Sequence, residues 1–460
     1  MSAAARDAVR AGRPQSSPNK PYQFPLFERR RLDNGTELII VPARKLPIAT
    51  VCVVVDAGAV ADPSGREGVA SLTADLLLEG TAKLSGAELV ERFEQLGAAL
   101  EVETGWDVTV ISLTALSEHF APAVRLLGET LRTPSFPARE VDRLKSERRA
   151  ELIALRSEPR GLADVMFSRV LYVGESRYAR PAGGTESSIA AIAADDVRRF
   201  YEQRYRAGGL TLVVVGDVDA DAAESLAREA FSGMQGGTPA PATTTITTAR
   251  PQRAVHLVSK PDAQQAELRI GHAGLARKHP DYFGATVMNA VLGGLFSSRI
   301  NLNLRERHGY TYGASSHFDW RRQAGPFSVS TAVQTEVTAK AAAEVIAEIE
   351  RIRGAEVDAD ELSLATSYMD GLFPIRFETT ESIAAALVNV TTFGLADDYH
   401  DTYRSRVRAT TVADVLDAAS KHLHPDALQM LIVGDVAHVR SQIEALGFGP
   451  LTVYEPNDLP

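Results

Sequence analysis

The sequence Val213-Val-Val-Gly-Asp-Val218 returns as Leu431-Ile-Val-Gly-Asp-Val436, 218 residues further along the chain. Each copy is a short apolar run that ends at a Gly-Asp turn, which is the pattern of a buried β-strand. A second pair of strand-like runs ends in Asp56-Ala-Gly58 and in His272-Ala-Gly274, with an offset of 216 residues. Two landmarks in the same order and at nearly the same spacing indicate a duplicated domain rather than coincidental strand composition.

The two copies are separated by residues 236–251, a segment rich in Gly, Pro and Thr. Such a segment has too few apolar side chains to form a core, so it reads as an extended linker. The sequence therefore predicts a flexible tail over residues 1–26, a first domain over 27–235, the linker over 236–251 and a second domain over 252–460.

Strands and helices alternate irregularly within each copy. Leu100–Leu116 alternates apolar and polar residues, as a half-buried strand does, whereas Phe120–Leu131 and Ala138–Arg156 have helical spacing. Strands that meet in hairpins, with helices packed on one side, favour an α+β fold over a doubly wound parallel sheet.

Composition excludes several classes of protein. The chain has 460 residues, of which 45% are hydrophobic and 23% are charged, which are ordinary globular values. Its formal net charge of −10 argues against nucleic acid as a partner, because an acidic surface repels phosphate. The single cysteine, Cys52, excludes an internal disulfide and a Cys-rich zinc module, and its apolar neighbours predict a buried thiol.

The cellular location is predicted from two features that the sequence lacks, a transmembrane segment and a secretory signal. No stretch approaches about 18 consecutive apolar residues, so no transmembrane segment is expected. Residues 1–20 lack the apolar core of a secretory signal, which predicts a cytoplasmic protein, or a periplasmic one if a signal was removed. Neither copy of the Gly-Asp turn continues into a glycine-rich phosphate loop, and the chain has no Gly-x-Ser-x-Gly nucleophile motif.

One helical segment resembles a known metal-binding motif. Gly68-Val-Ala-Ser-Leu-Thr-Ala-Asp-Leu-Leu-Leu-Glu-Gly-Thr81 resembles the insulinase (pitrilysin-type) metallopeptidases, whose pattern is Gly-Leu-Ala-His-x-x-Glu-His-Met-Leu-Phe-x-Gly-Thr. Other similar stretches extend the resemblance over almost the whole chain: Asp33-Asn-Gly-Thr-Glu-Leu38, Gly183-Gly-Thr185 and Leu292-Gly-Gly-Leu-Phe-Ser-Ser-Arg299. The resemblance implies two homologous α/β-roll domains like those of mitochondrial processing peptidase, each a mainly antiparallel sheet with helices on one face.

The zinc motif of that family is degenerate here. In the family, two histidines bind zinc and the glutamate between them is the general base. The resemblance aligns Ser71 and Asp75 with the histidines, Ala74 with the base and Glu151 with a third ligand, a glutamate further along. It therefore implies no metal in this chain and no peptidase activity of the chain alone. Glu151 is the one ligand of three that remains by type, and Asp75 offers a carboxylate in place of a histidine. Glu151 also fits a charged helix residue without metal.

The second copy keeps another family signature. Leu304-Arg305-Glu-Arg-His-Gly-Tyr-Thr-Tyr312 resembles the Arg-and-Tyr motif, with the same spacing of seven residues between Arg305 and Tyr312. In active relatives this pair faces the zinc from the opposite domain, where it binds substrate and stabilises the oxyanion. The alternative is a local salt bridge for Arg305 and a core position for Tyr312.

This chain lacks the family's zinc motif and keeps its Arg/Tyr motif. In this it resembles the zinc-less subunit of a two-chain peptidase. The resemblance then implies a homologous partner subunit that carries the zinc, in a heterodimer or larger assembly, and unstructured peptide substrates. Such peptides would add a strand at a sheet edge, expected near Gly97–Leu116. Two alternatives remain at this point: a non-enzymatic scaffold resembling the core subunits of respiratory complexes, and an active peptidase with an unusual metal site.

Overall fold

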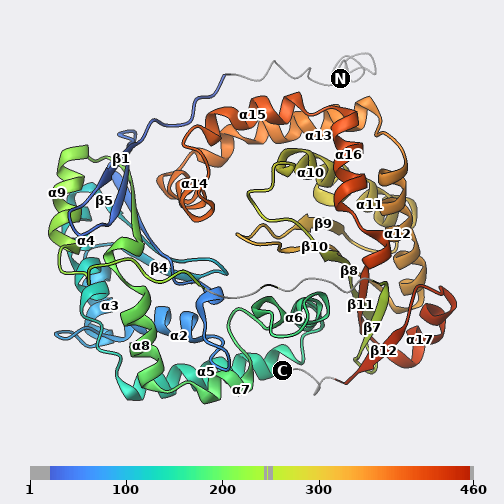
Figure 1. Cartoon of the computed structure of the whole chain (residues 1–460), viewed down its shortest axis with the longest axis horizontal. Helices are drawn as coiled ribbons and strands as arrows, with labels where there is room; N and C mark the ends of the chain where they lie inside the picture. Colours follow the sequence, from blue (N-terminus) through green and yellow to red (C-terminus); the bar gives the residue numbers. More distant parts are fainter. Residues whose placement is uncertain (1–20, 243–245, 247–251, 456–460) are drawn as a thin grey trace, which may run out of the picture.

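The computed structural model describes residues 21–242, 246 and 252–455. Two halves of similar build lie side by side, the first blue to green and the second yellow to red (Figure 1). Each half contains one six-stranded sheet with its own helices and its own apolar core. None of the helices in the described ranges is long and apolar enough to cross a membrane.

The first sheet contains six strands, and their order across the sheet is β1 (Glu28–Arg31), β2 (Glu37–Pro42), β6 (Leu210–Gly216), β3 (Ile48–Val55), β5 (Thr109–Leu116) and β4 (Ala99–Thr104). The order in the second sheet is β12 (Leu451–Tyr454), β7 (Ala254–Ser259), β11 (Gln429–Gly434), β8 (Gln265–Ala273), β10 (Pro326–Gln334) and β9 (Ala314–Phe318).

Five strands of each sheet repeat one topology. The orders β2-β6-β3-β5-β4 and β7-β11-β8-β10-β9 both begin with a parallel pair and continue with antiparallel pairs. The repeated apolar runs that begin at Val213 and Leu431 lie in β6 and β11, which occupy equivalent places. The sixth strands differ, because β1 is antiparallel to its neighbour and β12 is parallel. The structure thus confirms an α+β fold built from two homologous, mainly antiparallel sheets.

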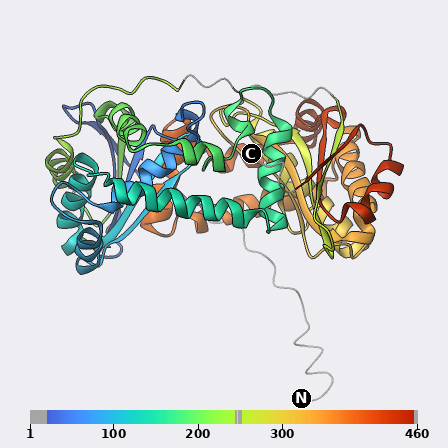
Figure 2. The same ribbon diagram turned by 90° about the horizontal axis from the view of Figure 1, so that it is seen from below.

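Helices cover one face of each sheet. In the first half they are α2 (Val69–Leu76), α3 (Gly86–Gln95), α4 (Ser117–Arg132), α5 (Ala138–Leu155), α7 (Glu186–Ala191), α8 (Ala194–Arg204) and α9 (Ala220–Phe231). In the second half they are α10 (Tyr282–Asn289), α11 (Arg299–Asn301), α12 (Thr338–Gly354), α13 (Ala359–Leu372), α15 (Tyr399–Ala409), α16 (Val412–His422) and α17 (Val436–Ala445). Figure 2 shows the long helix α5 running beneath the first half toward the second.

Two further helices are exchanged between the halves. α6 (Pro159–Leu171) belongs to the first half by sequence but packs on β8 and β11 of the second sheet. α14 (Thr380–Phe393) belongs to the second half but packs on β3 and β6 of the first. Figure 1 shows the orange α14 beside the first sheet and the green α6 beside the second. Part of the second face of each sheet is therefore covered as well, by a helix from the opposite half.

This exchange explains the composition of the central strands. In β3 and β6, alternate side chains point either to the main core or to α14. Val214 of β6 lies in the main core, whereas Val213 and Val215 contact the α14 cluster. A strand that is buried on both faces is apolar along its whole length instead of alternating.

Cys52 lies on β3 in the cluster beneath α14, which confirms the expected buried thiol. Burial, helped by the nearby charge of Glu381, raises the pKa of Cys52 from its ordinary value of 9.0 to about 12. Because the thiolate is the reactive form, we expect the native thiol at pH 8 to react with an aromatic disulfide at least about tenfold more slowly than in urea. Equal rates in native and unfolded protein would contradict this.

The free energy of unfolding should also fall as the pH rises above 9.0, since only the unfolded thiol of Cys52 then ionises. A Cys52→Ala variant should lack that slope.

Three sequence expectations need correction or limits. The strand expected over Leu100–Leu116 is two strands, β4 and β5, joined by a hairpin turn after Thr104. Most of the expected flexible tail lies outside the described residues, but at its end Phe24 is buried against His400 and Phe377. The expected linker lies largely outside the described residues too.

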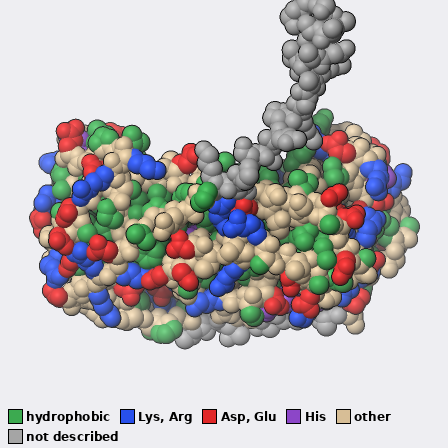
Figure 3. Space-filling view, turned by 90° about the horizontal axis from the view of Figure 1, so that it is seen from above, with side chains coloured by type: hydrophobic (Ala, Val, Ile, Leu, Met, Phe, Trp, Pro, Cys, Tyr) green, Lys and Arg blue, Asp and Glu red, His purple; other side chains and the backbone are tan. Residues whose placement is uncertain are grey.

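The surface carries both signs of charge. In the space-filling view of Figure 3, acidic and basic side chains are intermingled across the face that is shown. The net negative charge is therefore not gathered into one acidic area on this face.

Candidate functional site

The start of α2 is held by a buried ion pair. Asp62 accepts hydrogen bonds from the backbone N–H groups of Gly68 (2.7 Å) and Ala70 (2.9 Å) and from Arg177 Nη2 (2.7 Å). Burial raises the pKa of Asp62, and the charge of Arg177 opposes that rise. A carboxylate at a helix N-terminus satisfies N–H groups that have no partner within the helix.

The glycines of two motifs meet at the same place. Gly68 has a φ of 96°, a conformation that favours glycine. A Cβ on Gly68 would lie 2.6 Å from the carbonyl oxygen of Gly183, and one on Gly184 would lie 2.1 Å from the carbonyl oxygen of Glu67. Gly183-Gly-Thr185 therefore serves to seat the start of α2, which fixes the direction in which the motif positions on that helix point.

The degenerate motif positions converge on one arginine that the sequence analysis did not identify. Arg148 Nη2 on α5 donates to Ser71 Oγ at 3.0 Å and lies 3.5 Å from Asp75 Oδ2. Its Nη1 lies 3.1 Å from Glu151 Oε2. Ser71, Asp75 and Glu151 thus surround a guanidinium group, as the aligned family positions would surround a metal.

This donor set does not fit zinc. A zinc site needs imidazole, thiolate or carboxylate ligands around an open centre, whereas here a cation of the chain lies among one hydroxyl and two carboxylates. Ala74 is fully buried and has no group that could take a proton. Burial raises the pKa of Asp75, and Arg148 opposes the rise while Glu151 adds to it. We therefore assign no zinc chemistry to these residues.

Arg305 lies on the second half in a π-helical turn, Leu302–Arg307. Its guanidinium carbon is 4.6 Å from the centre of the Phe296 ring, and its Nε is 3.5 Å from a carboxylate oxygen of the adjacent Glu306. The side chain is 37% exposed. The local salt bridge of the alternative interpretation is present, but it leaves the guanidinium on the surface.

Tyr312 projects from the loop that follows. It is 92% exposed, and its hydroxyl has no hydrogen-bond partner among the described residues. The loop beneath it is fixed, because Thr311 Oγ1 donates to the Gly313 carbonyl and Thr331 of β10 donates to the same carbonyl at 3.1 Å. A core position for Tyr312 is therefore wrong: the phenol is presented to the outside.

The two candidate sets do not meet within this chain. Ser71, Asp75 and Glu151 belong to helices of the first half, and Arg305 and Tyr312 belong to the second, with no contact between the sets in the described part of the chain.

The expected substrate edge is a sheet edge in the structure. β4 is the last strand of the first sheet, and it also contacts α2. Leu100 and Val102 pack against the first core, whereas Glu101 and Glu103 line a cavity of about 730 Å³ between the sheet and α14. A second cavity of about 820 Å³ shares part of its wall with the first: Asp319, Trp320, Ala385, Asn389 and Phe393.

Both tryptophans of the chain lie at this cavity. Trp106 is in the β4–β5 turn, and Trp320 is in the equivalent β9–β10 turn, 214 residues later. The guanidinium of Arg321 lies 4.2 Å from the Trp106 ring centre, so the two turns pack together across the halves. The spacing of the tryptophans is thus a third repeat signal in the sequence, close to the offsets of the other two.

Comparison with protein families gives two matches. The insulinase family, peptidase family M16, matches residues 39–175, and the peptidase M16 inactive domain matches residues 191–369. Together the two models match 316 residues, more than two thirds of the chain.

Individual relatives agree with this. The chain is 24% identical over 391 residues to the Helicobacter pylori protein named non-peptidase homolog YmxG, which covers 85% of this chain and 90% of the relative. It is 22% identical over 360 residues to an uncharacterized zinc protease of Streptomyces coelicolor, with 77% and 78% covered. A crystal structure of a peptidase M16 inactive domain from Pseudomonas fluorescens matches with a TM-score of 0.83 at 27% identity, covering 89% of this chain and 98% of that one.

The repeated sheets, the motif glycines seated at α2, the Arg/Tyr loop and the two family matches lead to one assignment. This chain belongs to the insulinase family, peptidase family M16.

Proposed function

We propose that this chain is the zinc-less subunit of a heteromeric zinc metallopeptidase that degrades or processes peptides. In this proposal a homologous partner subunit carries the zinc, and this chain supplies Arg305 and Tyr312. The main support is the surface position of Tyr312, whose side chain is exposed and whose hydroxyl bonds to none of the described residues. The guanidinium of Arg148 at the degenerate motif also supports the assignment of the zinc to the partner subunit, because it leaves this chain without a metal of its own at that position.

The two side chains suit oxyanion stabilisation. A guanidinium and a phenol are hydrogen-bond donors, and donors that are fixed before the reaction stabilise charge as it develops. The ring of Phe296 packs against the guanidinium of Arg305, and hydrogen bonds to the Gly313 carbonyl hold the loop that carries Tyr312. The partner's zinc would supply the activated water.

The edge of β4 supports an extended peptide as the substrate. A peptide that added to β4 would gain main-chain hydrogen bonds and lie along the cavity. Carboxylates dominate that cavity: Glu101, Glu103, Asp107, Asp319 and Glu381, against the single arginine Arg321. We therefore infer a preference for peptides with basic side chains.

Co-expression tests the proposal. The partner is a chain of similar length with an intact His-x-x-Glu-His motif, sought first in an adjacent gene. We expect a stable complex that cleaves unstructured peptides, and no cleavage by either this chain alone or a complex whose partner lacks its motif glutamate. A partner that cleaves equally well without this chain would contradict the proposal.

A non-enzymatic scaffold is the second candidate. It is favoured by the similarity to a protein named non-peptidase homolog. It predicts that the same complex assembles but that peptide cleavage does not depend on Arg305 or Tyr312. An active peptidase with its own unusual metal site at α2 is disfavoured, because Arg148 lies among the residues that would have to bind the metal.

A further inference from the structure

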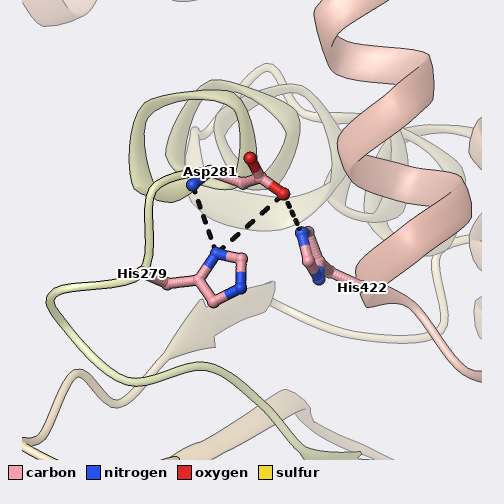
Figure 4. Close-up of side chains that lie close together, drawn as sticks. All are labelled: His279, Asp281 and His422. Atoms are coloured by element: carbon pink, nitrogen blue, oxygen red, sulfur yellow. Dashed lines mark hydrogen bonds and ion pairs between the residues drawn. The ribbon is translucent and has the colours of Figure 1, made fainter.

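Three metal-ligating side chains converge in the second half, away from both motif sites. They are His279, Asp281 and His422, and one ligand atom from each lies within 4.8 Å of the other two. No other group of three such side chains was found among the residues that the structure describes. Figure 4 shows them facing one another, two from the turn before α10 and one from the end of α16.

The carboxylate of Asp281 lies beside both imidazoles, and the backbone N–H of Asp281 donates to His279 Nδ1 at 3.2 Å, which leaves Nε2 of that ring free of this bond. Asp281 Oδ2 is 2.7 Å from His422 Nε2 and 3.9 Å from His279 Nδ1, and the two rings lie edge to face with their centres 4.9 Å apart. Asp281 occupies the N-cap position of α10, yet its side chain makes no capping hydrogen bond. The carboxylate is thus turned toward the histidines instead of the helix N-terminus, where an aspartate usually binds.

The backbone holds the three side chains in place before any ion binds. The turn is tied by a hydrogen bond from the His279 N–H to the Ala276 carbonyl (3.0 Å), and Pro280 stands between the two ligands. α10 packs closely against α16, since a Cβ on Gly284 would lie 3.4 Å from the Cβ of Ala418. A site on two packed elements keeps its geometry better than one on a loose loop.

The partial exposure of two of the three side chains leaves room for one more ligand. The side chain of His422 is 10% exposed, whereas those of His279 and Asp281 are 33% and 34% exposed. The group is therefore backed by protein on one side and open to solvent on the other. Two imidazoles and a carboxylate with an open fourth position form a donor set that suits zinc and related first-row ions.

We propose that His279, Asp281 and His422 bind one first-row divalent transition ion, with zinc as the preferred ion, and water as the remaining ligand. This site is separate from the degenerate motif, and it differs from the sequence-based expectation that this chain carries no metal. The ion would join the turn before α10 to the end of α16. That turn also carries Arg277, and α10 begins at Tyr282; both residues line the second cavity, so the ion would stiffen part of the cavity wall.

Zinc titration of the untagged full chain tests the site, with binding followed by calorimetry and melting temperature. We expect one zinc per chain with micromolar or tighter affinity, and a higher melting temperature with zinc because the ion binds the folded state. His279→Ala and Asp281→Asn should each weaken zinc binding at least about tenfold. Cobalt should give the visible absorption bands of a tetrahedral site, and both variants should lose them.

Two control variants locate the ion. His119→Ala removes a histidine that also lies beside a carboxylate, 3.7 Å from Glu118, but belongs to no group of three candidate ligands among the described residues. Asp75→Asn with Glu151→Gln removes the carboxylates of the degenerate motif. Both controls should bind zinc as the unmodified chain does.

Three results would overturn the site. The first is no stoichiometric zinc binding, the second is binding that His279→Ala leaves unchanged, and the third is binding that disappears with the Asp75 and Glu151 changes. His279 is partly exposed, so its replacement should leave the fold intact, and the melting temperature without zinc checks this. These measurements use the chain alone, so their outcome is independent of whether the chain pairs with a peptidase subunit.

Discussion

Tyr312→Phe is expected to lower kcat/KM of the assembled two-chain peptidase by about 10²–10³, the usual loss for one oxyanion donor. The change removes only a hydroxyl. Because this hydroxyl is exposed and bonds to no described residue, folding and subunit pairing should be unaffected. Peptide cleavage by the complex, its melting temperature and its assembly state should be measured together.

Arg305→Ala should cost at least as much activity, because it removes a charged donor that in our proposal also binds substrate. It also leaves Phe296 without the guanidinium that stacks on it. A small fall in melting temperature would therefore not contradict the prediction. Matched controls are Tyr368→Phe, which removes a hydroxyl from another exposed tyrosine, and Arg307→Ala, two residues away on the same turn. Neither control should change turnover.

The scaffold hypothesis predicts a different pattern. In a scaffold, replacement of Arg305 or Tyr312 would leave the activity of any assembly unchanged. A complex that stays assembled and fully active with both residues replaced would therefore end the role that we propose for them.

The second prediction concerns the guanidinium at the degenerate motif. Ser71→His with Asp75→His restores the two imidazoles, but we expect this double variant to bind zinc poorly while Arg148 remains. Two unit charges about 4 Å apart interact by about 4 kcal/mol near a protein surface. Since 1.4 kcal/mol is a factor of ten, adding Arg148→Ala should tighten zinc binding at least about 10²-fold.

Several details make this test specific. The variants are best made with His279→Ala, so that the proposed site in the second half does not contribute. Arg148→Ala alone should gain no zinc, because it supplies no ligand. Ala74→Glu is omitted, since Ala74 is fully buried and the family's glutamate is a base and not a ligand. If the triple change folds and still takes up no zinc, Glu151 does not correspond to the third ligand.

Much of the fold could be predicted from the sequence because the signals were local or repeated. Apolar runs followed by Gly-Asp turns identified β6 and β11, and their common offset with a second pair identified the duplication. Helical spacing placed α4 and α5 to within a few residues. Motif spacing predicted a functional role for Arg305 and Tyr312 without a structure, although not whether Tyr312 was inside or outside.

The misjudged features depend on contacts between distant segments. The hairpin between β4 and β5 was missed because alternation of apolar residues continues on both sides of the turn. The exchange of α6 and α14 leaves no periodic signal, because an apolar helix face looks the same whichever sheet it covers.

The sequence by itself determined the duplicated α+β fold, and it predicted the degenerate zinc motif and the Arg/Tyr motif. Each of these depends on residue types at fixed spacing along the chain. Only the tertiary structure decided that Arg148 contacts Ser71, Asp75 and Glu151. It also decided that Tyr312 is exposed and that His279 and His422 both lie beside Asp281. These contacts and exposures depend on how the fold brings together residues that are far apart in sequence. The periodicity of the sequence contains no information about such contacts.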